Sequence, residues 1–446
     1  MPDSNLREYA FALLERGVSH IANTRSGLTK DFVTLPDLTP HRYKVVNEAL
    51  SGYAEFDEIV SHILNHEVLG KRYCKEVVVR LVDDFLIEFL DRSPDTLDEK
   101  TFQELYAKFE RQLEEDYWII RSISPLYNLQ VQELMSGEAF ELSIMNDISL
   151  VYDPLLCGIM NTDQEILFLS ASYKVSKESV SIIDQLCRSV EQAIKKVERL
   201  LLALRLFKTG DVGTDVVRCK VYGKPHWEEV VTPLNCRVPE SIQKGAYVIY
   251  PEDTNNGVLQ GFCERVDTIL ADPHDGRVDI ACENFMNAYT KGYVDRVEGL
   301  IRGLQALFLK RGDPSCLLSR RASKFAASDE EEEKVVEEIV RKSYDLRSRI
   351  SHGNISLSSA ESIALQNLPL LEQCLRESIF YFIALARSKK LDDIIIQIDD
   401  NRKGFDDMKK IRLEANTLFW KGSRNIWKVD EKEVLPFLFG GKYSRC

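Results

Sequence analysis

The stretch that decides the fold is "YDLRSRISHGN", residues Tyr344 to Asn354. Gly353 is typical of the residue that follows a helix, and a histidine at position 352 lies where the helix dipole favours a cation. Five residues of helix place Arg347 about 140° from His352 around the helix axis. The segment is therefore an ordinary helix end, or it is half of an active site that is completed by a turn of the chain or by a second protomer.

The bulk composition is that of a soluble globular protein with more than one domain. Of the 446 residues, 44% are hydrophobic and 29% are charged, which excludes a disordered chain. The formal net charge of −13 means that a nucleic acid would have to bind at a local basic patch. Ten cysteines without a CxxC pair indicate reduced thiols rather than a zinc ribbon or a disulfide scaffold.

The sequence carries no sign of membrane insertion or secretion. The first residues, "MPDSNLREYAF", lack the apolar core of a signal peptide. The longest apolar run, "IFYFIALA" at 379–386, is far too short to cross a bilayer. We therefore expect a cytoplasmic protein with no membrane partner.

The pattern of apolar residues predicts an α+β fold in four parts. "EVVVRLVDDFLIEFL" (76–90) has a helical apolar stripe, whereas isoleucines and aromatics gather in short, strand-like runs between 116 and 145. From about residue 276 the helical pattern returns, and its four helices predict a bundle. The predicted parts are an N-terminal helical region (1–95), a mixed α/β module (96–275), a four-helix bundle (276–390) and a mixed C-terminal tail (391–446).

Local signals mark two helices of this bundle. The acidic run "DEEEE" (329–333) favours a helix start, and we expect that helix to end at His352 and Gly353. "SSAE" (358–361) predicts the cap of the next helix, in which Pro369 predicts a kink.

The stretch from 301 to 325 is locally basic in an acidic chain. It contains six cations and a single acid, Asp313. Such a surface suits contacts with phosphate groups, and a solvated helix face is the alternative interpretation. The six predicted RNA-binding residues are Arg302, Lys310, Arg311, Arg320, Arg321 and Lys324.

Two patterns that suggest a metal site have simpler explanations. His62 and His66 share a helix face, but their order is not HExxH and no third ligand is identifiable. "PDTLDEK" (94–100) resembles the acidic pattern of metal-dependent nucleases, yet its acids crowd into a helix start, where capping explains them. The chain also has no GxxxxGK[ST] loop for phosphates. We therefore expect neither a metal nor a cofactor.

The bundle sequence also resembles a known family. "YDLRSRISHG" matches a pattern in which an arginine is followed, after four to six residues, by a histidine at the end of a third helix. Together with "DIACENFMNAYTKGYVDRVEGLIRGLQALFL" (279–309), it resembles the HEPN superfamily (higher eukaryotes and prokaryotes nucleotide-binding), in its Apea-like branch. The resemblance is strong over roughly 276–390 and weaker from about 100. One departure is Gln305, which stands where the branch usually has an acid that we expect to orient the arginine.

The resemblance implies a metal-independent endoribonuclease that works as a homodimer, with two such motifs lining one cleft. A histidine, whose ordinary pKa is near 6.5, can move protons near neutral pH, and an arginine can stabilise the charge of a phosphorane-like transition state. The resemblance assigns these catalytic roles to Arg347 and His352. The predicted supporting residues are Ser351, Asn354, Gln305 and Tyr344.

The biological role that the resemblance implies is a toxin-like or anti-phage effector that cleaves tRNA or mRNA. The alternative is a non-catalytic HEPN module that binds RNA or a nucleotide, or that serves as a dimerisation and regulatory scaffold. Gln305 and the acidic net charge favour this alternative. In a third hypothesis, residues 1–275 sense a trigger or regulatory partner and restrain the bundle.

Overall fold

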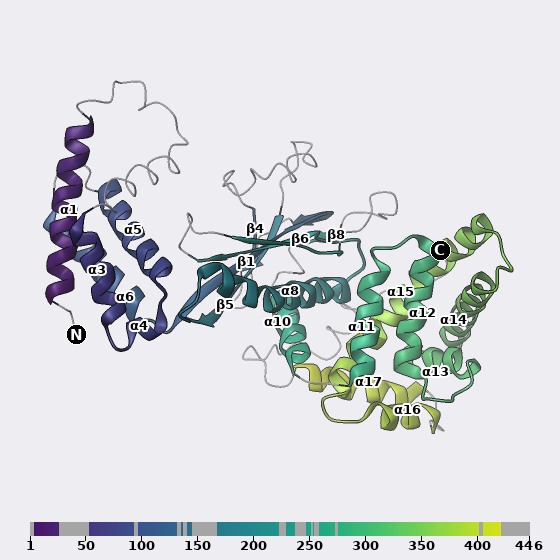
Figure 1. Ribbon diagram of the computed structural model, residues 1–446. Coiled ribbons are helices and arrows are strands. Elements are labelled where there is room, and N and C mark those ends of the chain that lie inside the picture. The colour runs from purple at the N-terminus through teal and green to yellow at the C-terminus, as the bar shows by residue number, and fades with distance from the viewer. Residues whose placement is uncertain are drawn as a thin grey trace. The chain divides into compact units, whose positions relative to one another are not determined.

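The protein is mixed α+β with helices predominating, which confirms the α+β part of the prediction (Figure 1). The chain divides into two compact units. The first comprises residues 1–122, 172–191 and 218–230, and the second comprises 123–171, 192–217 and 231–446. The computed structural model describes residues 4–25, 53–92, 97–131, 135–136, 141–144, 167–222, 229–236, 247–250, 253, 258–272, 275–400 and 405–420.

The first unit begins with helices that enclose an aromatic core. Phe85 and Phe109 lie with their ring centroids 5.2 Å apart, and Phe102 stacks on Tyr106 at 5.5 Å. The last of these helices is capped by Asp98, whose side chain accepts a hydrogen bond of 2.9 Å from the Thr101 N–H, so this acid of "PDTLDEK" serves as a helix cap. The helices are α1 (Ser4–Arg25), α3 (Ala54–Asn65), α4 (Leu69–Arg72), α5 (Lys75–Arg92) and α6 (Glu99–Glu114).

A six-stranded sheet follows in the order β3-β4-β5-β1-β6-β7. Strands β3, β4 and β5 pair antiparallel, and β2 and β8 form a separate parallel pair. The strands are β1 (Tyr117–Leu126), β2 (Leu129–Val131), β3 (Met135–Ser136), β4 (Glu141–Ile144), β5 (Leu167–Ser176), β6 (Val216–Val221), β7 (Val230–Pro233) and β8 (Tyr247–Ile249). The strand-like runs of the sequence therefore do form strands.

The second unit is dominated by helices that pack side by side (Figure 1). Helix α12 packs against α11, α14 and α15, and α13 packs against α14. These helices bury a continuous apolar core that includes Leu300, Leu304 and Phe382. The helices of this region are α8 (Ile182–Phe207, shared by the two units), α10 (Val258–Ala271), α11 (Gly276–Ala288), α12 (Tyr293–Phe308), α13 (Cys316–Ala326), α14 (Glu330–Ser351), α15 (Leu357–Leu385), α16 (Leu391–Asp399) and α17 (Phe405–Trp420).

Two details of this region differ from the sequence prediction. Helix α15 is capped by Ser356, which accepts from the Ser359 N–H, so it starts two residues before the predicted "SSAE" cap. The predicted mixed tail is helical over α16 and α17, and residues 421–446 lie outside the described part of the chain.

A buried polar cluster ties α8, α12 and α15 together. The Arg296 guanidinium donates to Glu372 at 2.9 Å and to Asp211 at 3.3 Å. The Tyr289 hydroxyl donates to Glu372 at 2.6 Å, and the guanidinium carbons of Arg205 and Arg296 lie 4.2 and 4.5 Å from the Tyr289 ring centroid. The two cations and two carboxylates balance each other, as buried charges must.

In the described residues, no helix is both long and apolar enough to pass through a membrane.

Candidate active site at the end of α14

Helix α14 ends in the motif that the sequence predicts. Gly353 has φ +67, its N–H donates to the Ile350 carbonyl at 3.0 Å, and the Asn354 N–H donates to the Arg349 carbonyl at 2.8 Å. These two bonds form a Schellman motif, which requires a residue in the left-handed region after the helix. The motif places His352 at the C-cap, directly after the last helical residue Ser351, and His352 is exposed.

Arg347 lies within α14 and is held by side chains of α12. Its Nη1 donates to Gln305 Oε1 at 2.9 Å, and its Nε lies 4.0 Å from Glu298 Oε1. The side chain is 27% exposed, so one part of the guanidinium is oriented by the protein while another part faces solvent. Gln305 thus contacts the arginine that we expected it to orient.

Glu298 adds a second arginine to this site. It accepts a hydrogen bond of 2.6 Å from Arg302 Nη2, so Arg302 and Arg347 share one carboxylate. Glu298, Arg302 and Gln305 follow at four and three residues along α12, which places them on one helix face. Two guanidiniums against one carboxylate leave a local excess of positive charge, which suits a phosphate group.

Sequence reasoning missed Glu298. It lies in the quoted helix, one turn before Arg302, but nothing in its local spacing shows that it faces α14. Only the packing of α12 against α14 brings it near Arg347. The signal that could have pointed to Glu298 is its spacing of four residues from Arg302. That spacing usually indicates an ion pair on a helix surface and not a site residue.

The predicted supporting residues surround the helix end. Ser351 and Asn354 are exposed, and Tyr344 is partly buried. The Asn354 backbone terminates the helix, so its side chain remains available for another role. Among the described residues, no hydrogen bond joins the His352 imidazole to Arg347. A single protomer therefore presents the two groups separately.

The structure corrects one residue of the predicted basic surface. Arg321 is 4% exposed and cannot contact RNA in this fold. Its guanidinium binds both carboxylate oxygens of Asp399 at 2.8 Å, the Phe308 carbonyl at 2.8 Å, and Asp313. It therefore fastens the segment before α13 to α16.

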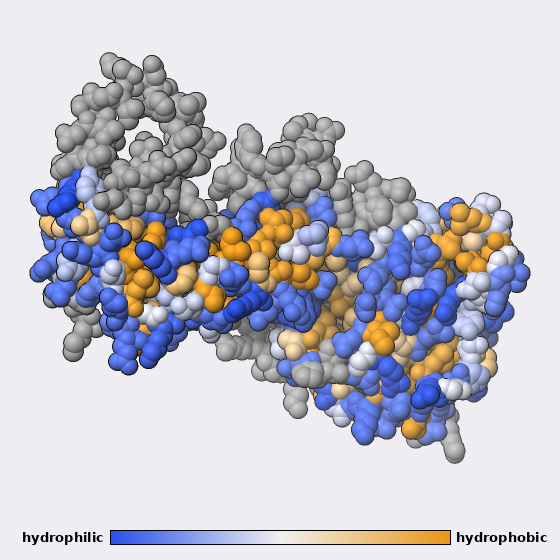
Figure 2. All heavy atoms as spheres, viewed as in Figure 1, coloured by the Kyte–Doolittle hydropathy of each residue, from blue (hydrophilic) through white to orange (hydrophobic). Residues whose placement is uncertain are grey.

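The other five cations of the run keep some access to solvent. Arg302, Arg311 and Arg320 are exposed, and Lys310 and Lys324 are partly buried. Figure 2 shows that the visible face of the helical region is mostly hydrophilic, with separate hydrophobic patches.

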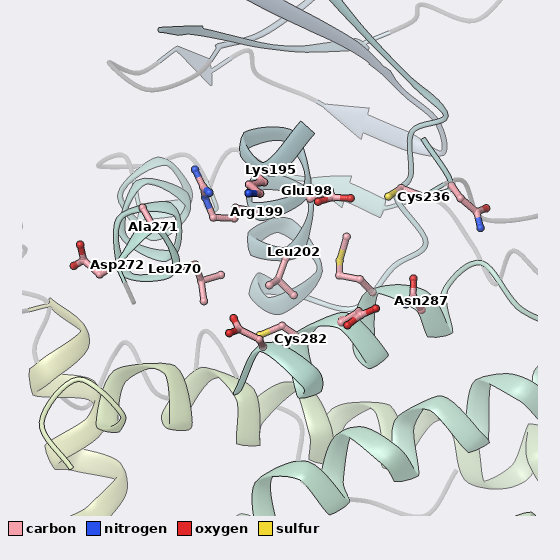
Figure 3. Close-up of a pocket in the computed structure, with 14 residues that line it drawn as sticks. Lys195, Glu198, Arg199, Leu202, Cys236, Leu270, Ala271, Asp272, Cys282 and Asn287 are labelled. Carbon is pink, nitrogen blue, oxygen red and sulfur yellow. The ribbon is translucent and has the colours of Figure 1, made fainter. Parts of the chain in front are cut away.

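A cavity of about 770 Å³ lies away from α14, between residues of α8, α10 and α11 (Figure 3). Glu198 and Glu283 both line it, and burial, with the nearby charge of Glu283, raises the pKa of Glu198. Burial also raises the pKa of the Cys282 thiol to about 12. Within the described residues, no group of three or more His, Cys, Asp or Glu side chains could hold a metal ion. The cavity therefore offers carboxylates without the ligand set of a metal centre.

The two histidines considered as metal ligands have other contacts. The His62 ring lies 6.4 Å from the Tyr9 ring, edge to face. His66 ends α3, and its Nδ1 accepts from the backbone N–H groups of Val68 and Leu69. The His62 side chain therefore packs on Tyr9, and the His66 side chain caps the start of α4.

Comparisons of the chain with family models, with curated proteins and with solved structures find no match.

Proposed function

We propose that this protein is a metal-independent endoribonuclease of the HEPN type, in which Arg347 and His352 act on one phosphodiester. The observation that carries the proposal is the end of α14. Arg347 is partly exposed and is oriented by two side chains of α12, Gln305 and Glu298. His352, five residues further along the chain, is exposed.

The chemistry needs only groups that this helix end offers. The ribose 2′-oxygen attacks the adjacent phosphorus while its proton passes to a base, and the 5′-oxygen leaves with a proton from an acid. The products are a 2′,3′-cyclic phosphate and a free 5′-hydroxyl. A histidine can act as the base or the acid, and a planar guanidinium can bind two oxygens of the pentacovalent phosphorus.

The two proton transfers favour a dimer. One imidazole cannot be base and acid on opposite sides of the phosphorus in the same step. A second copy that brings its own α14 end to the same cleft supplies the second histidine and a second arginine. Ser351 and Asn354, exposed beside His352, are the polar groups available to hold the ribose or the flanking phosphates.

The test is cleavage of total RNA and of purified tRNA by the full chain in EDTA. His352→Ala and Arg347→Ala should each lower the rate by about 100-fold or more. Arg349→Ala is the matched control, because Arg349 is an exposed arginine in the same helical turn, and its rate should stay close to that of the unmodified protein. Cleavage products with cyclic phosphate ends would support the proposed chemistry. RNA that stays intact, or cleavage unchanged in His352→Ala, would refute it.

A second candidate function is RNA or nucleotide binding without turnover. The specific observation that favours it is Gln305, since a neutral amide holds Arg347 less firmly than a carboxylate would. Retained affinity for RNA with no products at any protein concentration would select this alternative. The toxin-like or anti-phage role belongs to the nuclease proposal alone, and it predicts that expression of the intact chain, but not of His352→Ala, arrests growth of a host cell.

A further inference from the structure

Arg302 and Arg347 approach each other from two helices. Glu298 Oε1 accepts a hydrogen bond of 2.6 Å from Arg302 Nη2 on α12, and the same oxygen lies 4.0 Å from Arg347 Nε on α14. One oxygen atom therefore lies close to both guanidiniums. A phosphate group carries several oxygens and is larger than one atom, so a phosphate beside Glu298 can contact both cations at once.

Both guanidiniums keep N–H groups that make no hydrogen bond to the described residues. An arginine side chain has five such donors on three nitrogens. Among the described residues, Arg302 forms a hydrogen bond only through Nη2, and Arg347 only through Nη1, which donates to Gln305 Oε1 at 2.9 Å. The side chains of Arg302 and Arg347 are 55% and 27% exposed. Solvent, and hence a ligand, reaches both.

The acids around the two arginines do not balance their charge. Glu298 is the one acid among the described residues that forms an ion pair with either of them. Asp295 lies on α12 about 10 Å along the helix axis from Arg302. Asp345 lies two residues before Arg347, so it points to the opposite side of α14, and it is paired with another arginine at 3.9 Å. Two cations therefore share one carboxylate in this part of the bundle, where residues 275–400 are described without a gap.

An ordinary surface ion pair is the simpler explanation for Glu298 and Arg302, because they lie four residues apart on one helix. Such a pair involves one helix only and contributes little to stability. Glu298, however, is 32% exposed and also contacts Arg347, the arginine of the candidate active site on α14. Its carboxylate therefore holds the two guanidiniums next to each other.

We infer that Arg302 is a second catalytic arginine of the proposed ribonuclease, and that Glu298 positions it beside Arg347. This role rests on the proposed function. Both guanidiniums donate to the non-bridging oxygens of the scissile phosphate. These oxygens gain negative charge once the 2′-oxygen has bonded to phosphorus and before the 5′-oxygen leaves, and two cations stabilise that charge more than one. Neither arginine gives or takes a proton, so the proton of the 2′-hydroxyl still passes to the base and the 5′-oxygen still receives one from the acid.

The test measures kcat and KM for RNA cleavage by the full chain in EDTA. Arg302→Ala should lower kcat by about 100-fold and change KM by about threefold at most, because the contact strengthens in the transition state. Arg302→Lys should stay about tenfold below the unmodified protein, because an ammonium group lacks the planar fork of donors. Guanidinium ion at millimolar concentration should restore part of the activity of Arg302→Ala, which the loss of a merely structural side chain would not allow.

Two substitutions of Glu298 test its positioning role. Glu298→Ala should lower kcat about tenfold with little change in KM, as expected when a residue that orients a catalytic group is lost. Glu298→Gln keeps an oxygen that accepts from Arg302 and should retain most of the activity. The matched control is Arg341→Ala, because Arg341 is also an exposed arginine paired with an acid four residues away on one helix, at 3.9 Å. Its kcat should equal that of the unmodified protein, and circular dichroism of each variant confirms that it is folded.

The possible results separate this role from the proposed function. If the unmodified chain cleaves no RNA, the nuclease proposal fails and the catalytic role of Arg302 fails with it. If the unmodified chain cleaves RNA and Arg302→Ala cleaves as fast as Arg341→Ala, only the role of Arg302 is overturned. A raised KM with unchanged kcat in Arg302→Ala would overturn it as well, because Arg302 would then bind the ground state and the transition state equally.

Discussion

Replacing Glu372 by Gln tests whether the buried polar cluster stabilises the helical region. Glu372 on α15 is 6% exposed and accepts hydrogen bonds from Tyr289 and Arg296. The substitution keeps the shape of the side chain and removes its charge. It therefore creates no cavity, and its effect reports the electrostatic contribution of the carboxylate.

The expected loss follows from what remains around Arg296. Burial acts to lower the pKa of Arg296, and Glu372, Tyr289 and Asp211 more than offset it, so the pKa lies above its ordinary value. Without Glu372, Asp211 at 3.3 Å is the remaining ion-pair partner of Arg296 among the described residues. The Arg296 Nε and Nη1 atoms have no hydrogen-bond partner among the described residues. Breaking a buried ion pair costs about 3–5 kcal/mol, and because Asp211 remains we expect the lower end, about 3 kcal/mol.

Differential scanning calorimetry of the full chain measures the change. Glu361→Gln is the matched control, because Glu361 is an exposed acid on the same helix, and its free energy of unfolding should change by less than about 0.5 kcal/mol. Arg296→Met combined with Glu372→Gln should be less destabilised than Glu372→Gln alone, since it removes the unbalanced cation. If Glu372→Gln unfolds like Glu361→Gln, then the cluster contributes no net stability and the electrostatic argument fails.

Three further predictions concern local structure and pH. Asp329 accepts from the Glu332 N–H at 2.8 Å, so Asp329→Ala should cost about 1 kcal/mol of unfolding free energy in a denaturant titration. Gly353→Ala should lower the free energy of unfolding by about 1 kcal/mol, because φ is +67 there. Gly292→Ala is the control and should cost less, because φ is −63 there and the space around it is open. Equal losses in the two variants would contradict this reasoning. Burial raises the pKa of the Cys219 thiol from 9.0 to about 11, so the folded state keeps a proton that the unfolded state releases. That stabilisation is complete below pH 9 and disappears as the pH rises to 11, so Cys219 alone should lower the unfolding free energy by about 1 kcal/mol between pH 8 and 10. Other buried thiols with a raised pKa, such as Cys282, add to the total fall, and Cys219→Ala should make that fall smaller by about 1 kcal/mol.

Helix α14 shows which parts of the fold could be predicted from local sequence. Its start is set by Asp329 and the acids that follow, and its end is set by Gly353. Each of these signals acts on the helical turn next to it, so it can be recognised without knowledge of the tertiary fold. The predicted bounds are confirmed for that reason. The "SSAE" cap of α15 was predicted two residues late, because three of four consecutive residues (356, 358 and 359) are serines and each can act as an N-cap; the helix uses Ser356.

Contacts between distant segments explain the errors. Arg321 has the sequence context of a surface cation, but it is buried against Asp399, which lies 78 residues later. The pairing of β2 with β8 is likewise invisible in the sequence, because each is three residues long and its partner lies beyond several other elements. Glu298 was overlooked because its contact with Arg347 crosses from one helix to another.

The packing of α12 positions the side chains that orient Arg347. A Cβ atom on Gly303 would lie 2.7 Å from Leu375 Cδ2, and one on Gly299 would lie 3.4 Å from the Asn284 carbonyl oxygen. The two glycines therefore allow α12 to approach α15 and α11 closely. That approach fixes the rotation of α12, and the same rotation directs Glu298 and Gln305 toward Arg347 on α14. Because one rigid helix buries Arg296 in the core and presents these side chains to the site, the orientation of the Arg347 guanidinium is set by core packing. A larger residue at position 303 would have to displace the buried Leu375 side chain, and whether it also changes the orientation of Arg347 depends on how far α12 moves with it.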